Sequence, residues 1–356
     1  MGEYNLKSSQ AFCYVRDCML GAGHWVLVFI EPFFQKIQDL IMHLFLTPLP
    51  PEERMYFPGN LRFKRKCLFF LFFISCLFPW QGYSSGFASL NLASEARFGA
   101  LGNTGVALFG DPSIGFRNPA GLVSGNSGME VSFNQWMKDV QSGFLAFSIP
   151  GHGRGVGFHL LYTEIGNLEY RVVPSPESFG TFSFHEAIAG VSFAQNICPW
   201  FSLGVNTKMC YEKIFVDEAI GWAIDFGGGI RVSPKWTWGM VLQNIGKTAK
   251  LANASISLPL TFRTGSAFAF STAWFDGVFL ADGVKEKDSK WHLHVGLECE
   301  KWKSVFFRLG YQSGYALYRM TTGIGIQWRK YRIDYAYVPM KKGFGNHSRF
   351  SINVSF

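Results

Sequence analysis

The sequence is poor in charged residues and in cysteines that could shape a fold. Asp, Glu, Lys and Arg make up only 16% of its 356 residues, against about 25% in soluble domains. The seven cysteines include no C-x-x-C pair and no Cys/His spacing of a zinc site, which excludes a disulfide scaffold. Aromatic residues, by contrast, reach 17%, with 37 Phe and 11 Trp. Much of the chain is therefore expected to face an apolar core or lipid.

Motifs of catalysis and nucleotide binding are also missing. There is no G-x-S-x-G elbow, no H-E-x-x-H pair and no Walker loop, and the glycine-rich run at 151–157 lacks the Lys-Ser/Thr of a phosphate loop. The net charge of +8 comes from scattered Lys and Arg without a nucleic-acid motif. The sequence predicts no enzyme, no nucleic-acid partner and no cofactor. A Ser/His pair brought together only by folding stays the enzymatic alternative.

Residues 61–85 show the three parts of a secretory signal: a basic start, an apolar run and small residues at the end. The apolar run is shorter than the ~20 residues that a spanning helix needs. Cleavage is expected after Ser84 or Ala88. A lipoprotein signal at Cys76 is the alternative, although Phe73 replaces the usual Leu three residues before it.

This signal lies far from residue 1, whereas export signals are read at the amino end. Met55 stands just upstream of it. We therefore expect 1–54 to be a mis-assigned start or dispensable leader, and 55–85 to be the signal peptide. The alternative is a genuine membrane-associated helix within the apolar stretch 25–46.

From Gly128 onward the hydrophobic pattern has a period of two, which is typical of strands with two distinct faces. In 220–231, Ile, Trp and Phe alternate with Gly, Ala, Asp and Arg, and similar alternation covers 201–212, 291–298 and 305–312. The second face is small or polar. A soluble sandwich would also alternate, so the pattern alone does not choose between sandwich and membrane barrel.

Turn signals divide this body into about fourteen segments, many long enough to cross a membrane as tilted strands of ~9–11 residues. The two segments near 181–195 are expected to be one strand. The segments lie near 129–136, 140–149, 154–163, 181–186, 187–195, 201–212, 219–232, 236–245, 259–271, 274–282, 291–300, 304–312, 319–329 and 331–338, with a further one at 346–356.

Tryptophans near the segment ends and the last residues of the chain favour a membrane barrel. An interfacial girdle is predicted for Trp136, Trp200, Trp236, Trp238, Trp291, Trp302 and Trp328. The ending RFSINVSF, closed by Phe356, resembles the terminal strand by which bacterial outer-membrane barrels are recognised for insertion. A closed sheet satisfies its backbone in lipid because it has no edges.

We therefore predict an all-β fold, a transmembrane antiparallel β-barrel of about 14 strands over 128–356. Its expected location is the bacterial outer membrane. Its expected partners are outer-membrane lipid and, through the C-terminal strand, the barrel assembly machinery. A monomer is expected.

Residues 93–122, ASEARFGALGNTGVALFGDPSIGFRNPAGL, carry a more specific signal. They resemble the N-terminal segment of FadL-type long-chain fatty-acid transporters and of the related PorV/PorQ outer-membrane family, including FadL-like paralogues of spirochaetes. The matching residues are Gly99, Gly102, Gly105, Asp111, Asn118, Pro119, Ala120, Gly121 and Leu122. The close match covers this segment, and strand periodicity extends it more loosely over the body.

The resemblance implies an N-terminal hatch, residues 86–127, that plugs the barrel from the periplasmic side. Hatch and gating roles fall to Asp111, Asn118, Pro119, Ala120 and Gly121. The residues suit a compact turn: Pro119 keeps Asn118 out of the helical region, Asn118 can bond its own backbone, and Gly121 can take a positive φ. An ordinary surface turn capped by Asp111 and Asn118 is the alternative.

The resemblance further implies uptake of hydrophobic molecules, with long-chain fatty acids as the expected ligand, opened by movement of the hatch. A sideways exit through the wall is one route. A carboxylate would need a cation on the small or polar face, and Arg263 and Arg308 are the preferred candidates. The full candidate set is Lys208, Arg231, Arg263, Arg308 and Arg329, each of which could instead pair with Asp225, Glu212 or Glu298.

Three alternatives remain open. His292 and His294 share one side of a strand and could hold a metal with Glu298, but a wet barrel interior tolerates histidines, and no metal is predicted. A PorV-like partner of a protein secretion or surface-attachment system is the alternative function, and a purely structural barrel is another. The mostly short loops favour transport.

Overall fold

The structure, a computed structural model, describes residues 86–136, 139–171, 178–249, 251, 256–287, 289–315, 319–340 and 346–356. The predictions for 1–54 and for the signal peptide at 55–85 lie outside the described residues. Within the described ranges, no helix is both long enough and apolar enough to cross a membrane.

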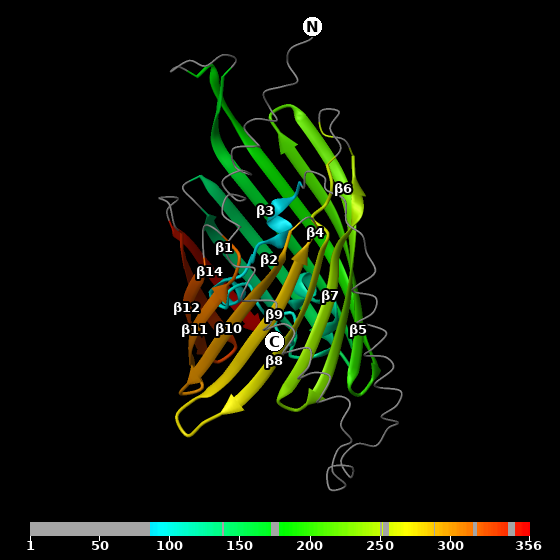
Figure 1. Ribbon diagram of the computed structural model, residues 1–356, viewed down its shortest axis with the longest axis vertical. Coiled ribbons are helices and arrows are strands. Elements are labelled where there is room, and N and C mark those ends of the chain that lie inside the picture. The colour runs from blue at the N-terminus through cyan, green and yellow to red at the C-terminus, as the bar shows by residue number, and fades with distance from the viewer. Residues whose placement is uncertain are drawn as a thin grey trace, which may run out of the picture. The chain divides into compact units, whose positions relative to one another are not determined.

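The body is a closed antiparallel barrel of fourteen strands that follow one another in chain order (Figure 1). The predicted pair near 181–195 is one strand, β4, and the last segment is β14, so the expected strand number is confirmed. The strands are β1 (Gly128–Trp136), β2 (Val140–Pro150), β3 (Arg154–Tyr170), β4 (Gly180–Cys198), β5 (Phe201–Ile214), β6 (Asp217–Ser233), β7 (Trp236–Thr248), β8 (Thr261–Ser271), β9 (Asp276–Glu286), β10 (Trp291–Lys301), β11 (Val305–Gln312), β12 (Met320–Trp328), β13 (Tyr331–Pro339) and β14 (Asn346–Ser355).

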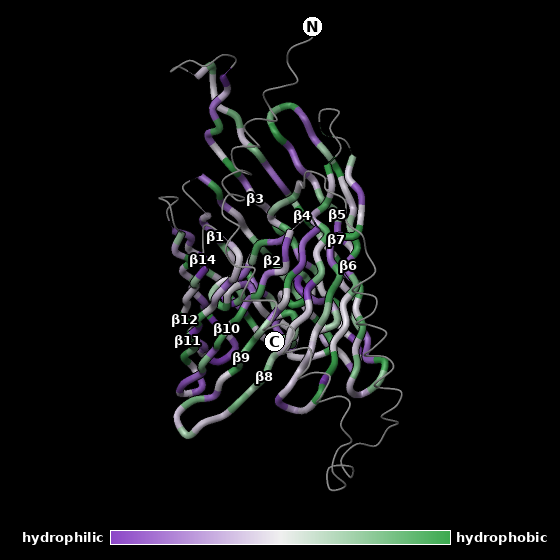
Figure 2. The backbone as a smooth tube through the Cα atoms, viewed as in Figure 1, coloured by the Kyte–Doolittle hydropathy of each residue, from purple (hydrophilic) through white to green (hydrophobic). Residues whose placement is uncertain are grey.

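The seam between β1 and β14 closes the barrel, with Phe133 opposite Phe350 in the register. The two faces of each strand differ as predicted, and Figure 2 shows hydrophobic and hydrophilic residues alternating along the strands. In β6, Ile220 and Trp222 are more than half exposed on the outer face, whereas Asp225 is buried on the inner face. An apolar outer surface is what lipid requires.

The girdle prediction is wrong for Trp136, and for the other tryptophans a place at the membrane interface stays a prediction. Exposed Trp236 and Trp291 begin β7 and β10, and exposed Trp328 ends β12. Trp136 is 7% exposed and lies on the inward face of β1. Its indole Nε1 donates to Ser142 Oγ at 3.0 Å, so this ring belongs to the barrel interior.

The wall is taller on one side. The strands from β3 to β7 have 13 to 19 residues, whereas β8 to β14 have 8 to 11. A bulge in β7 opposes both Gln243 and Asn244 to Asp225 of β6. Because a bulge adds one residue to a strand, these two neighbouring side chains both point inward and are buried.

Residues 86–127 lie inside the barrel as a hatch of short helical elements, drawn in cyan in Figure 1. They are η2 (Ala88–Asn91), α4 (Ala96–Ala100), α5 (Ile114–Arg117) and η3 (Pro119–Val123). Element α4 contacts the strands β11 to β14, and η3 contacts β2 to β6. The hatch therefore bridges two opposite parts of the wall.

Candidate gate and ligand site

The Asn-Pro-Ala-Gly-Leu motif joins two parts of the hatch to the wall. Asn118 has extended backbone at φ −150°, as the following Pro119 dictates, and its Oδ1 accepts a hydrogen bond from Ala120 N at 3.1 Å. Its Nδ2 donates to Val106 O at 2.8 Å and to Gly228 O of β6 at 3.2 Å. Asn118 is thus a helix cap, as the surface-turn alternative proposed, but a fully buried one that also contacts β6.

Gly121 does not take the positive φ open to a glycine, because it lies within the helical turn η3. The glycine is needed there for space: a Cβ would stand 2.5 Å from Ile114 Cγ1 and 2.7 Å from Phe109 Cδ1. Positive φ occurs instead at Gly102 (68°) and Gly105 (120°), two other glycines of the same segment.

Glycines on the inner face of the wall leave room for the Asn-Pro-Ala-Gly-Leu motif. A Cβ on Gly204 of β5 would lie 2.4 Å from Ala120 N, and a Cβ on Gly227 of β6 would lie 2.2 Å from Asn118 Oδ1. Real Cβ atoms do not approach that closely, so neither wall position accepts a side chain unless the motif moves. The small inner face of these strands is therefore the contact surface of the hatch.

Six side chains form a closed ring of ion pairs, here called the charge ring, between the hatch and β10, β11 and β13. Successive N–O distances around it are 3.0, 2.9, 2.8, 2.7, 2.5 and 2.5 Å. Two members belong to the hatch and four to the wall. In order they are Arg97, Asp111, Arg332, Asp334, Arg308 and Glu298.

Three arginines and three carboxylates make the charge ring neutral, and each member contacts two of opposite charge. Burial raises the pKa of Asp111, but the guanidinium groups of Arg332 and Arg97 outweigh that effect and hold the pKa well below its usual range. Asp111 also accepts from Ser113 Oγ at 2.7 Å. This hatch residue therefore stays ionised and bound to the wall.

The candidate cations have different surroundings. Arg308 is fully buried between Glu298 and Asp334, and Lys208 pairs with Asp225 at 2.8 Å, so the ion-pair alternative describes both. Arg231 and Arg329 are exposed, the former donating to Ser124 Oγ of the hatch at 3.2 Å and the latter lying over Trp328.

Arg263 of β8 is different, since it is 4% exposed yet pairs with no carboxylate among the described residues. Among the described residues, its Nη atoms donate only to the backbone oxygens of Asn103 and Asn91, each at 3.3 Å, and its Nε has no partner. It lines a cavity with room for about one water molecule. The other lining residues are Leu90, Leu92, Asn103, Phe116, Arg117 and Gln243.

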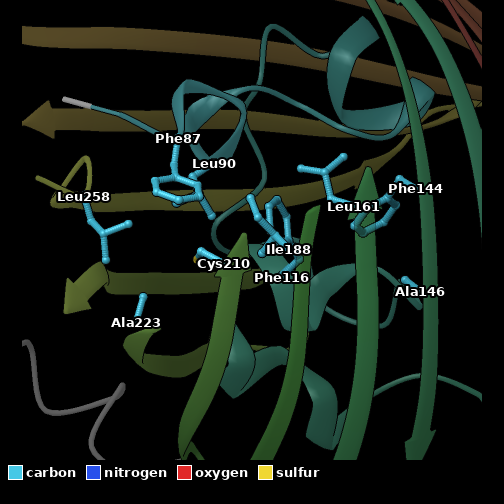
Figure 3. Packing of buried hydrophobic residues seen from close by; sticks show 10 residues of the cluster. All are labelled: Phe87, Leu90, Phe116, Phe144, Ala146, Leu161, Ile188, Cys210, Ala223 and Leu258. Atoms are coloured by element: carbon cyan, nitrogen blue, oxygen red, sulfur yellow. The ribbon is translucent and has the colours of Figure 1, made fainter. Parts of the chain in front are cut away.

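Beside this cavity, apolar side chains pack against one another inside the barrel, and we call this filled cluster the lumenal pocket (Figure 3). Phe87 and Leu90 of the hatch fill it, and both are at most 4% exposed. Its other members are Phe116, Phe144, Ala146, Leu161, Ile188, Cys210, Ala223 and Leu258. The interior of a membrane barrel is ordinarily polar, so an apolar group of this extent inside the wall requires an explanation.

The two histidines considered for a metal site, His292 and His294, contact other groups. His294 lies near Asn103 O at 3.4 Å and Tyr315 Oη at 3.3 Å, and His292 stacks on the Tyr315 ring. Glu298 belongs to the charge ring. In the part of the chain that the structure describes, no three His, Cys, Asp or Glu side chains are grouped as ligands for a metal ion.

Sequence reasoning missed two parts of this arrangement. The wall members Arg332 and Asp334 of the charge ring carry no motif, although their i, i+2 spacing places both on the inner face of β13. The lumenal pocket did leave a signal. Phe144 and Leu161 are bulky apolar residues at inward positions, whereas the other inward positions of β2 and β3 are small or polar.

No protein-family model matches the sequence, and no curated protein matches it. Solved structures are similar. A monoaromatic hydrocarbon channel, CymD, superposes with a TM-score of 0.53 at 13% identity, covering 76% of this chain and 99% of that one. The toluene transporter TodX of Pseudomonas putida gives a TM-score of 0.51 at 11% identity, covering 78% and 97%. The chain therefore has the barrel fold of these outer-membrane hydrophobic channels.

Proposed function

We propose that this chain is an outer-membrane channel for small hydrophobic molecules, with residues 86–127 as its gate. The observation that carries the proposal is the lumenal pocket, an apolar site inside a membrane barrel that the chain fills with its own Phe87 and Leu90. The similar structures support it, since they are described as a channel and a transporter for aromatic hydrocarbons.

The gate works by exchange of apolar groups. A hydrophobic ligand that enters the lumenal pocket takes the place of Phe87 and Leu90, and the segment 86–92 moves aside. Burial of the ligand offsets the lost burial of the two side chains, because both scale with apolar area at about 25 cal/mol per Å². The charge ring meanwhile keeps Arg97 and Asp111 against the wall.

For a long-chain fatty acid, Arg263 is the residue that meets the carboxylate. It is a buried cation without a carboxylate partner, its cavity includes Arg117, and Leu90 and Phe116 line both the cavity and the lumenal pocket. A carboxylate there would supply the missing countercharge. Arg308, the other preferred candidate, serves the charge ring in this proposal.

The test is equilibrium dialysis of dodecanoate and dodecanol against the protein in nonionic detergent, with protein-free micelles as the blank. Both molecules are expected to bind saturably. Arg263→Met should weaken dodecanoate about tenfold, since a hydrogen bond to a charged group is worth about 1.5–3 kcal/mol, and should leave dodecanol unchanged. Phe87→Ala should strengthen both, because the competing side chain is smaller.

Absence of saturable binding by either molecule would overturn the proposal. In that case pull-downs would test the secretion-partner alternative, which no described feature of the barrel favours. A monomeric state and recognition of the terminal Phe356 by the assembly machinery stay predictions.

A further inference from the structure

Two glutamates face each other inside the barrel next to the lumenal pocket. Glu186 of β4 and Glu212 of β5 are direct cross-strand partners, and each is 2% exposed. The next inward pair in the same register is Ile188 and Cys210, both members of the lumenal pocket. Like charges directly opposite each other destabilise a sheet. This acidic pair therefore lowers the stability of the barrel unless another group compensates for it.

No described basic side chain offsets the two carboxylates. Lys208, the closest inward lysine on β5, pairs with Asp225, and Arg263 forms no ion pair with either glutamate. The groups that do contact them belong to the hatch: Ser89 Oγ donates to Glu186, and the backbone of Phe87 lies beside the Glu212 carboxylate. The hatch thus supplies a hydrogen-bond donor but no positive charge.

A third polar group on the same inner face lacks a partner. Thr163 of β3 stands directly opposite Glu186 in the register and is 8% exposed. Its Oγ1 is buried and accepts no hydrogen bond from any described residue. Two carboxylates and one hydroxyl on adjacent strands therefore face a place that the hatch fills with the Ser89 hydroxyl and the Phe87 backbone.

The segment 87–90 occupies this site in the manner of a ligand. Phe87 and Leu90 fill the apolar part, while Ser89 and the Phe87 backbone meet the acceptors. A molecule that replaces the segment must bring an apolar tail, and its head gains most if it carries both donors and a positive charge. A primary ammonium group has three donors, no acceptor and one charge.

We propose that Glu186, Glu212 and Thr163 form a second head-group subsite of the lumenal pocket, one that binds the ammonium of an alkylamine. The proposal rests on the proposed function, because it takes the lumenal pocket to be a ligand site. Arg263 contacts the hatch at Asn91, and the acidic subsite contacts it at Ser89. These two hatch residues stand on either side of Leu90 in the sequence. One channel would then receive hydrophobic molecules of either head charge.

The experiment compares dodecylammonium, dodecanol and dodecanoate, which share one tail, by equilibrium dialysis against the protein in nonionic detergent. Dodecylammonium is expected to bind more tightly than dodecanol. Glu186→Gln and Glu212→Gln should each weaken dodecylammonium about tenfold or more, as for loss of a charged hydrogen bond, and should leave dodecanol within about twofold. Thr163→Val should weaken dodecylammonium by a smaller factor, since it removes a neutral acceptor.

Matched controls separate this subsite from the Arg263 cavity. Glu218→Gln removes a carboxylate from the outer face of β6, where Glu218 accepts from Tyr211 Oη, and should change no affinity. Arg263→Met should weaken dodecanoate and spare dodecylammonium. Circular dichroism of each variant checks that the barrel has formed.

Two results would overturn the inference alone: dodecylammonium binding no tighter than dodecanol, or unchanged dodecylammonium binding in both glutamine variants. Failure of all three molecules to bind would remove the proposed function, and this inference with it.

Discussion

The two sides of the barrel interior hold the hatch by different physics. On the side of β10 to β13, the charge ring surrounds Arg97 and Asp111, and each ionised group has two partners of opposite sign. On the side of β2 to β6, the side chains of Phe87 and Leu90 make apolar contacts, and no described cation pairs with the acidic residues Glu186 and Glu212. On the first side the protein supplies every countercharge, whereas on the second side a ligand can take over the contacts of the hatch.

Because of this difference, the charge ring anchors the hatch, whereas the apolar contacts can be exchanged for a ligand. Removal of one member of a buried ion pair costs about 3–5 kcal/mol, because the partner is left charged and buried. Apolar contacts are non-directional, so another apolar group of similar area replaces them with little net change. We therefore expect the segment 86–92 to yield to a ligand while α4 and Asp111 stay in place.

The largest expected effect comes from breaking the charge ring at Arg308. Arg308→Met leaves Glu298 and Asp334 without their shared cation, and we expect the free energy of unfolding to fall by about 3–5 kcal/mol. Urea unfolding of the protein in lipid vesicles measures it. Arg329→Met, at an exposed position, is the matched control and should change stability by less than about 0.5 kcal/mol. Equal losses in the two variants would refute an anchoring role.

A smaller effect is expected when a wall glycine beside the Asn-Pro-Ala-Gly-Leu motif is replaced. Gly204→Ala puts a Cβ 2.4 Å from Ala120 N, and such overpacking costs about 1–3 kcal/mol. The strain should push Asn118 to Leu122 off the wall and raise the ion conductance of the protein in a planar lipid bilayer. Gly143→Ala is the control, since a Cβ there meets nothing within 4 Å. If both variants conduct like the unchanged protein, close packing of the motif does not seal the channel.

The smallest expected effect is a lack of change with pH. Because the folded-state pKa of Asp111 lies below its usual value, its stabilising contribution is complete above the unfolded pKa of about 3.9. That contribution is lost only as the pH falls through the lower folded pKa. The difference in unfolding free energy between the unchanged protein and Asp111→Asn should therefore be the same at pH 8 and pH 5. A difference that shrinks by pH 5 would show that Asp111 is not held ionised by Arg97 and Arg332.

The parts predicted from sequence are those that a local pattern encodes. Turn signals indicated the strand number, and period-two alternation indicated the faces, because side-chain direction in a strand depends on parity alone. The conformation at Asn118 followed from Pro119 in the same way. Trp136 was misplaced because position near a strand end was weighed above its parity, which puts it on the inner face with Glu130 and Asn134.

The parts that were missed depend on contacts between distant residues. Parity places Arg308 and Arg263 on the inner face alike, yet one is enclosed by two carboxylates and the other by backbone oxygens. That distinction arises because the neighbouring strands supply Glu298 and Asp334 to Arg308, whereas the hatch supplies the carbonyls of Asn91 and Asn103 to Arg263. Lys208 and Asp225 were foreseen as a pair only as one of several options, since the register between β5 and β6 was needed to join them.

The charge ring also dictates an order of assembly. It joins Asp111 to Arg332, which are 221 positions apart in the chain, and contacts at such separation form late because a long loop must close first. Until β13 has taken its place, Arg97 and Asp111 have only part of their countercharge. The hatch therefore gains its full set of ion pairs only when the wall is almost complete. In a chain that ends before Arg332, Asp111 would lack one of its two arginine partners.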